Sequence, residues 1–215
     1  MRNSLLVLVW LVVLYFLLKY YIPFGNYVLY PINLIVTFLH EFGHAFFALI
    51  TWWEVLWIKI NPDGSGYTIT SWWIQSLVLM WGYIWSAIFW NLLIYIWFKK
   101  PKLSENVILF FSLLMILVAI FWYQSLLTSI ILILLAIWLY FISKKTNYDA
   151  LVLQAVWVFS ILYIIQDFNV WPSSDLAKFS FIFPSWAWMW IWLMIVLGIT
   201  GYNLKLILTD KNEKV

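Results

Sequence analysis

Both histidines of the chain lie in one short motif, His40-Glu41-Phe42-Gly43-His44, which has the spacing HExxH. In a helix, residues four apart lie one above the other on the same face, so His40 and His44 can bind one zinc ion together. Glu41 is turned away from that face, yet it is near enough to take a proton from zinc-bound water. Zinc lowers the pKa of bound water to about 7, which makes a hydroxide nucleophile available at neutral pH. The motif therefore predicts a hydrolytic zinc site with Glu41 as the general base.

The motif lies inside a long apolar segment, which we predict to be a membrane-spanning helix over residues 31–57. His40 follows Pro31 by nine residues, or about 14 Å along a helix, which is close to the middle of a bilayer. A charged side chain at that depth costs about 2.5–3.5 kcal/mol on insertion scales. A glutamate between two histidines at that depth therefore indicates a functional site. The alternative is a structural role, in which the polar cluster only holds helices together.

A catalytic zinc site needs a third protein ligand and leaves the fourth position to water. The chain has no cysteine and no third histidine, so the third ligand is expected to be a carboxylate. Most acidic residues lie at span ends, in loops or in the tail, where hydration explains them. Asp167 and Asp175 differ because they flank a turn at residues 169–172, between the last two spans. Either aspartate can reach the metal from that loop, and simple hydration is the alternative for each.

The composition of the chain places these residues in a membrane. Of 215 residues, 66% are hydrophobic and 10% are charged, whereas about a quarter are charged in a soluble domain. The 12 Lys and Arg are too few for a nucleic-acid-binding face, so no nucleic-acid partner is expected. The expected fold class is an all-α polytopic membrane protein with about seven transmembrane helices and a short membrane-associated β-hairpin after the HExxH helix. The predicted localisation is that of a multi-pass integral membrane protein in contact with the lipid bilayer.

The expected spans are apolar segments bounded by helix breakers and charges. The first segment lacks the small-residue cleavage site of a signal peptide, which favours an anchor. One apolar stretch is too long for a single crossing, and we divide it at residues 122–125. The spans are predicted at residues 4–21, 31–57, 73–98, 106–121, 125–142, 148–166 and 184–206.

We expect a single integral membrane domain over residues 1–215, without internal repeats. Nine cations fall on one face and three on the other when span ends alternate, which favours the first face as cytoplasmic. The loops after the HExxH helix and before the last span then share the opposite face. The parts of the domain are an N-terminal anchoring span (1–26), the HExxH helix with a hairpin and the next helix (27–98), accessory spans (99–166), an Asp-containing loop with the last span (167–206) and a polar tail (207–215).

The segment after the HExxH helix is expected to form a β-hairpin over residues 58–70, because Tyr67 and Ile69 alternate with threonines after a Pro-Asp-Gly turn. The HEFGH helix, this Gly-containing hairpin and an Asp downstream of an NxxP turn resemble the site-2 protease family of intramembrane zinc metallopeptidases, in particular its compact branch without a PDZ domain. Residues 81–87, Trp-Gly-Tyr-Ile-Trp-Ser-Ala, are similar to a helix that packs beside the metal site in that family.

The resemblance implies roles for further residues. In the family pattern, Asn169 and Pro172 form the turn and Asp175 is the third zinc ligand. An edge strand of the hairpin can pair with an extended substrate by β-augmentation, and Gly64 and Gly66 would let the two backbones approach closely. Asn169 is expected either to hold the substrate backbone or to form the turn, and both roles stay open.

Together these features predict a zinc metalloendopeptidase that hydrolyses peptide bonds of membrane-spanning protein or peptide substrates. The cofactor is Zn²⁺, held by His40, His44 and Asp175, and Glu41 is the catalytic residue. The alternative is a catalytically silent zinc-binding membrane protein that binds or chaperones transmembrane helices. Glu41 favours the enzyme, because a pure binder does not need it. An ion transporter is disfavoured because inverted repeats and several polar spans are not evident. The sequence leaves the oligomeric state open.

Overall fold

The computed structural model describes residues 2–71, 75–122, 124–146, 149–167, 175–178 and 184–209. Most of them belong to seven long helices: α1 (Arg2–Tyr20), α2 (Gly25–Ile50), α3 (Gln75–Lys99), α4 (Ser104–Phe121), α5 (Leu126–Thr146), α6 (Asp149–Asp167) and α8 (Ser185–Thr209). The shorter elements are strands β1 (Val55–Ile60) and β2 (Gly66–Thr70), the 3-10 turn η1 (Pro101–Leu103) and the one-turn helix α7 (Asp175–Lys178).

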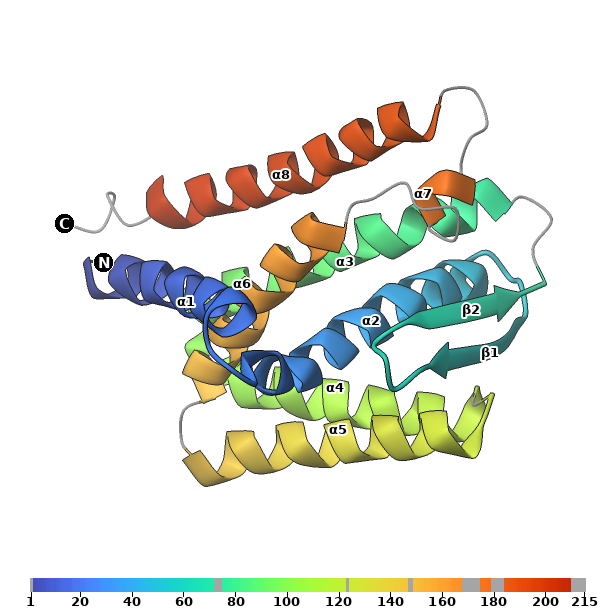
Figure 1. Cartoon of the computed structure of the whole chain (residues 1–215), viewed down its shortest axis with the longest axis horizontal. Coiled ribbons are helices and arrows are strands. Elements are labelled where there is room, and N and C mark those ends of the chain that lie inside the picture. Colours follow the sequence, from blue (N-terminus) through green and yellow to red (C-terminus); the bar gives the residue numbers. More distant parts are fainter. Residues whose placement is uncertain are drawn as a thin grey trace.

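Helix α2 carries the HExxH motif and lies at the centre of the molecule (Figure 1). It contacts α1, α3, α6 and both strands of the hairpin. Helices α4 and α5 pack against each other beside it, and α8 lies at the periphery along α3. The HExxH motif is thus enclosed by elements from both halves of the chain.

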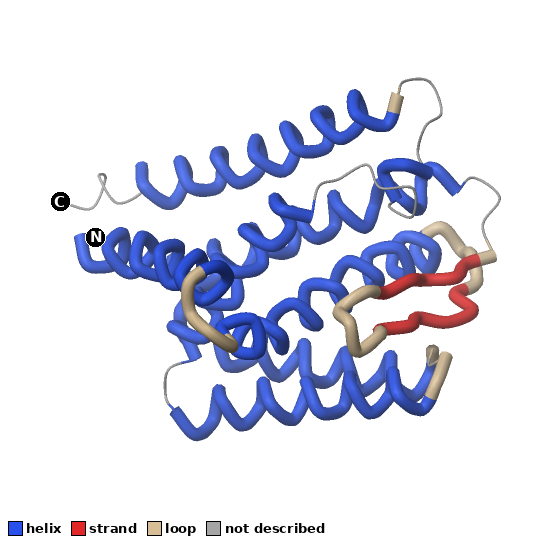
Figure 2. The backbone as a smooth tube through the Cα atoms, viewed as in Figure 1, coloured by secondary structure: helices blue, strands red, loops and turns tan. Residues whose placement is uncertain are grey.

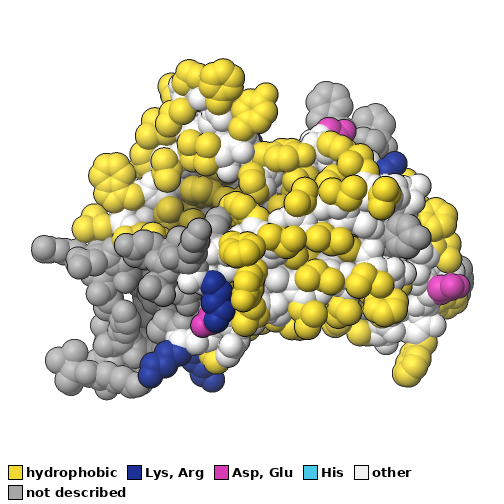
Figure 3. All heavy atoms as spheres, turned by 90° about the horizontal axis from the view of Figure 1, so that it is seen from below, with side chains coloured by type: hydrophobic (Ala, Val, Ile, Leu, Met, Phe, Trp, Pro, Cys, Tyr) yellow, Lys and Arg dark blue, Asp and Glu magenta, His cyan; other side chains and the backbone are white. Residues whose placement is uncertain are grey.

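Four helical segments in the described part are long and apolar enough to cross a bilayer: Gly25–Ile50, Val78–Ile96, Ser104–Phe121 and Ser185–Lys205. The described apolar stretches of α1, α5 and α6 are shorter. The face seen from the side of α5 is covered mostly by hydrophobic side chains, with the few charged ones toward its ends (Figure 3). The helical fold and the hairpin agree with the prediction, whereas seven crossings stay a prediction.

The HExxH helix is displaced from its predicted position. It spans Gly25–Ile50 instead of residues 31–57, and residues 55–57 belong to β1. The prediction was wrong there because an apolar run does not distinguish a buried strand from a helix. His40 therefore lies about 22 Å from the start of α2 and about 15 Å from its end. The other six predicted spans match helices to within four residues at each end.

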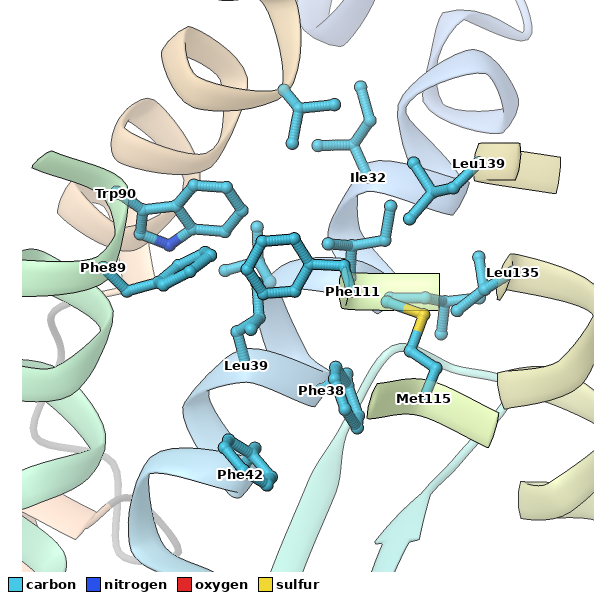
Figure 4. Packing of buried hydrophobic residues seen from close by; sticks show 14 of the residues in the cluster. Ile32, Phe38, Leu39, Phe42, Phe89, Trp90, Phe111, Met115, Leu135 and Leu139 are labelled. Atoms are coloured by element: carbon cyan, nitrogen blue, oxygen red, sulfur yellow. The ribbon is translucent and has the colours of Figure 1, made fainter. Parts of the chain in front are cut away.

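The core lies between α2 and helices α3 to α6. Leu39 of α2 faces Trp90 of α3 and Phe111 of α4 across this core (Figure 4). Leu39 and Trp90 are at most 1% exposed. Burial of such large apolar side chains inside the protein fixes the rotation of α2 about its axis. That rotation directs the histidine face toward α3.

The hairpin of β1 and β2 is antiparallel and lies along α2 (Figure 2). Its first strand begins at Val55, earlier than predicted. The connection between α4 and α5 and the first turn of α5 occupy the outer edge of β1. The Ile58 amide donates to the Trp122 carbonyl at 2.8 Å, and the Ile60 amide donates to the Thr128 hydroxyl of α5 at 3.4 Å. Among the described residues, β2 is the strand whose outer edge makes no backbone hydrogen bond.

Two side chains of α2 hold the tip of the hairpin. The Tyr30 hydroxyl donates to the Pro62 carbonyl at 2.6 Å, and the Thr37 hydroxyl donates to the Gly64 carbonyl at 2.6 Å. The hairpin thus runs back from the end of α2 to the level of Tyr30. This course takes β2 past Glu41.

Candidate metal centre

The side chains of His40, His44 and Asp175 converge in one cluster. One carboxylate oxygen of Asp175, Oδ2, lies 3.0 Å from Nε2 of His40 and 3.1 Å from Nε2 of His44. The two Nε2 atoms are 3.2 Å apart, and the candidate ligand atoms all lie within 4.8 Å of one another. Two imidazole nitrogens and one carboxylate oxygen are the donors of a catalytic zinc site that leaves one position for water. The cluster has the chemistry to hold a metal ion.

Elements far apart in the sequence bring these ligand atoms together. His40 and His44 share a face of α2 because they are one helical turn apart. Asp175 is the first residue of α7, which contacts both α3 and α8. Asp167, the other candidate, ends α6, and its side chain lies outside the described part. Asn169 and Pro172 also lie outside the described residues, so the roles expected for them stay predictions.

Helix α3 orients the His44 ring. Nδ1 of His44 lies 2.7 Å from the backbone carbonyl of Val78. A carbonyl can only accept, so the Nδ1–H donates and Nε2 keeps its lone pair. This lone pair faces the cluster, as it does in metal-binding histidines whose second nitrogen donates to a carbonyl. The Val78 carbonyl was not among the predicted functional groups, because a backbone group carries no sequence signal.

Helix α3 also forms a wall of the cluster at Gly82. A Cβ atom there would lie 2.4 Å from Cε1 of His44 and 2.8 Å from Cε1 of His40. The next residue, Tyr83, packs edge-on against the His40 ring, with ring centroids 4.7 Å apart. Glycine at position 82 therefore leaves the space that both imidazoles occupy. The resemblance at residues 81–87 indicated this segment but not the contact.

Glu41 lies between the histidines in sequence and against β2 in space. It is 6% exposed, and the Thr68 hydroxyl lies 2.9 Å from its Oε2 and 2.9 Å from its backbone carbonyl. A Cβ atom on Gly66 would lie 2.8 Å from Cγ of Glu41. The hairpin thus packs on the Glu41 side chain, and the Thr68 hydroxyl lies against its carboxylate, a contact that the sequence did not predict.

The two predicted substrate-binding glycines of the hairpin have different surroundings. Gly66 leaves room for α2, whereas Gly64 has a φ of 88° and open space around its Cβ position. A positive φ is typical of glycine in a tight turn. The structure explains both glycines through the hairpin itself, and their contact with a substrate stays a prediction.

The three side chains of the cluster differ in exposure. The side chains of His40 and Asp175 are each 19% exposed, whereas that of His44 is 6% exposed. His40 and Asp175 are thus the more exposed residues of the cluster, whereas the His44 ring lies against α3.

Comparison with known families agrees with this geometry. A family model described as Peptidase M50B-like matches residues 5–203, which include the HExxH helix, the hairpin, Gly82 and Asp175. Neither the curated proteins nor the solved structures gave a match. Peptidases of this class are membrane-embedded and zinc-dependent, and no PDZ domain was found in the chain. The chain therefore belongs to the Peptidase M50B-like family and is a member of the site-2 protease family of metallopeptidases.

Proposed function

We propose that the protein is a multi-pass intramembrane zinc metalloprotease that hydrolyses peptide bonds of membrane-spanning substrates. The observation that carries this proposal is the convergence of the ligand atoms of His40, His44 and Asp175 within 4.8 Å. The two histidines belong to a helix that is apolar and long enough to cross a bilayer. Glu41, the one acidic residue inside the motif, is buried beside this cluster. Family membership supports the same class of reaction.

The chain supplies the parts that hydrolysis needs. His40, His44 and Asp175 would hold a zinc ion, and the Nδ1 hydrogen bond of His44 keeps its ring in place. A zinc ion held there would supply Lewis-acid activation of the scissile carbonyl and of a water molecule. The Glu41 carboxylate would accept the proton of the attacking water and return it to the leaving amine, while the Thr68 hydroxyl fixes the carboxylate by a hydrogen bond to Oε2.

The open edge of β2 supports a binding mode for the substrate. The amides of Ile58 and Ile60 point away from β2, so their partners Thr68 and Gly66 belong to non-hydrogen-bonded pairs. In such pairs the backbone groups of both residues point outward, which places those of Gly66 and Thr68 on the open edge. β-Augmentation of an extended substrate on this edge brings its backbone beside Glu41. A helix must unwind there, because a helical amide is hidden from attack.

Cleavage by purified protein in lipid vesicles tests the proposal. The probes are single-span peptides with a fluorophore at one end and a Gly-Pro pair in one half of the span. Wild type should cleave them, and Glu41→Gln should keep its zinc while cleavage falls below detection. Glu54→Gln is the matched control, because Glu54 is an exposed glutamate at the start of the hairpin. Equal cleavage by wild type and Glu41→Gln would refute the catalytic role of Glu41. Zinc-loaded wild type that binds the peptides and cleaves none would identify the catalytically silent binder instead.

A further inference from the structure

Two aromatic residues in an unusual backbone conformation bracket the HExxH helix. Phe24 precedes α2 with a φ of 63°, and Trp52 follows its C-cap with a φ of 62°. They are the non-glycine residues with positive φ in the described part of the chain. This left-handed region favours glycine and strains any residue with a Cβ atom.

The backbone around Trp52 forms the helix ending that glycine usually occupies. The Trp52 amide donates to the Leu49 carbonyl at 3.1 Å, and the Trp53 amide donates to the Ala48 carbonyl at 2.9 Å. These bonds define a Schellman motif with Trp52 at its left-handed position. A glycine there would end the helix with less strain.

Packing inside the chain does not explain the two aromatic side chains either. Trp52 is 96% exposed and Phe24 is 78% exposed. Each therefore strains the backbone while its side chain buries little or no surface within the protein. Within the described residues the Phe24 ring contacts the exposed Tyr27 ring, with centroids 6.1 Å apart, and most of the surface of both Phe24 and Trp52 faces away from the protein.

The spacing of the two residues matches one external partner, the phospholipid bilayer. Phe24 and Trp52 are 28 residues apart, or about 42 Å along a helix, and a bilayer with its headgroup regions is about 40–45 Å thick. Tyr21 and Tyr27, 77% and 75% exposed, lie beside Phe24. Exposed Glu54 follows Trp52 by two residues. Aromatic rings with polar neighbours are typical of the boundary between acyl chains and headgroups.

We propose that Trp52 and Phe24 anchor the two ends of α2 in the opposite headgroup regions of a phospholipid bilayer, and so set the depth of the metal centre. Counted from Trp52, His44 and His40 then lie about 12 and 18 Å below the interface. The midpoint between Trp52 and Phe24 lies about 21 Å from Trp52, so the cluster lies on the hairpin side of the bilayer midplane. The proposal rests on α2 crossing the bilayer, as the proposed function does, and is independent of proteolysis.

Fluorine NMR of fluorotryptophan-labelled protein in phosphatidylcholine nanodiscs tests the anchor. Trp52→Phe identifies the signal of Trp52, and Trp10→Phe identifies that of Trp10, a 68% exposed control residue inside α1. We expect a headgroup nitroxide lipid to broaden the Trp52 signal several-fold more than a lipid with the nitroxide near its chain end, and the reverse order for Trp10. Broadening of Trp52 only by a water-soluble gadolinium chelate, or mainly by the chain-end label, would overturn the proposal. If the chain-end label broadens neither Trp10 nor any other signal, the chain is not embedded and the proposed function fails with it.

Bilayers of different thickness provide a second readout with a variant that should still fold. Trp52→Gly relieves the strained position and removes the anchor. Ile50, the last residue of α2, is 51% exposed and is replaced by cysteine to carry a spin label. Because the chain has no native cysteine, this label alone reports the depth of the end of α2 in the bilayer. In wild type the distance of this label from the headgroups should stay constant as acyl chains lengthen, as it should in the control Trp10→Leu. In Trp52→Gly it should drift by several ångströms, and a constant distance there would contradict the anchor.

Discussion

Replacement of Gly82 by alanine tests whether α3 sets the geometry of the metal centre. The added Cβ would lie 2.4 Å from Cε1 of His44, whereas carbon atoms pack at about 3.5–4.0 Å. The ring must retreat by about 1 Å, and a metal ligand tolerates a displacement of about 0.2 Å. Loss of ligand orientation typically lowers metal affinity by about 10–100-fold, or about 1.4–2.8 kcal/mol. We therefore expect Gly82→Ala to bind zinc at least tenfold more weakly than wild type.

Zinc affinity measured by competition with a chromophoric chelator checks this prediction. Gly198→Ala and Gly201→Ala are matched controls in α8, because a Cβ atom at either position meets nothing within 4 Å. Both should bind zinc as wild type does. Circular dichroism should show that all three variants keep their helices, since alanine favours a helix over glycine by about 1 kcal/mol. Wild-type zinc affinity in folded Gly82→Ala would refute the steric reasoning.

Three further predictions concern other parts of the site and the fold. Thr68→Val removes the hydroxyl that bonds Oε2 of Glu41, so kcat should fall about tenfold at unchanged zinc content, and an unchanged kcat would exclude this positioning role. Asp175→Asn should weaken zinc binding about 100-fold or more while the chain stays folded, whereas Asp167→Asn should bind zinc with wild-type affinity. Weaker zinc binding by Asp167→Asn than by Asp175→Asn would assign the third ligand to Asp167. Asn203 of α8 donates to the Asn91 carbonyl of α3 at 2.6 Å, so Asn203→Leu should destabilise the fold by about 0.6–1.7 kcal/mol in thermal unfolding, and an unchanged midpoint would show that this contact contributes nothing.

Local spacing in the sequence was enough to predict that the two histidines of α2 come together. The interval between His40 and His44 places both on one helical face whatever the rest of the chain does, and the structure brings them together as expected. The choice of Asp175 over Asp167 depended on the family resemblance, because two loop aspartates near one turn have the same local pattern. Hydrophobic length located most helices but missed the turn at Trp52, because a mostly apolar run such as residues 51–57 does not distinguish a helix from a strand.

The contacts that complete the site could not be read from the sequence. The local sequence does not distinguish Gly82 from other glycines in apolar helices. Only the packing of α3 on α2 places Gly82 against the two imidazoles. Thr68 is one of several hairpin threonines, and only the register of β2 against α2 places its hydroxyl on Glu41. Both contacts join segments whose approach is set by tertiary packing, which no local pattern encodes.

X-ray absorption at the zinc edge of protein purified without chelator tests the central claim most directly. The proposed centre predicts about one zinc per chain, bound by two imidazole nitrogens at about 2.0–2.1 Å with the remaining ligands oxygen. The same protein with His40→Ala and His44→Ala should carry no zinc. Wild-type protein that holds no metal, or a double variant that keeps an unchanged zinc spectrum, would contradict a metal centre on α2.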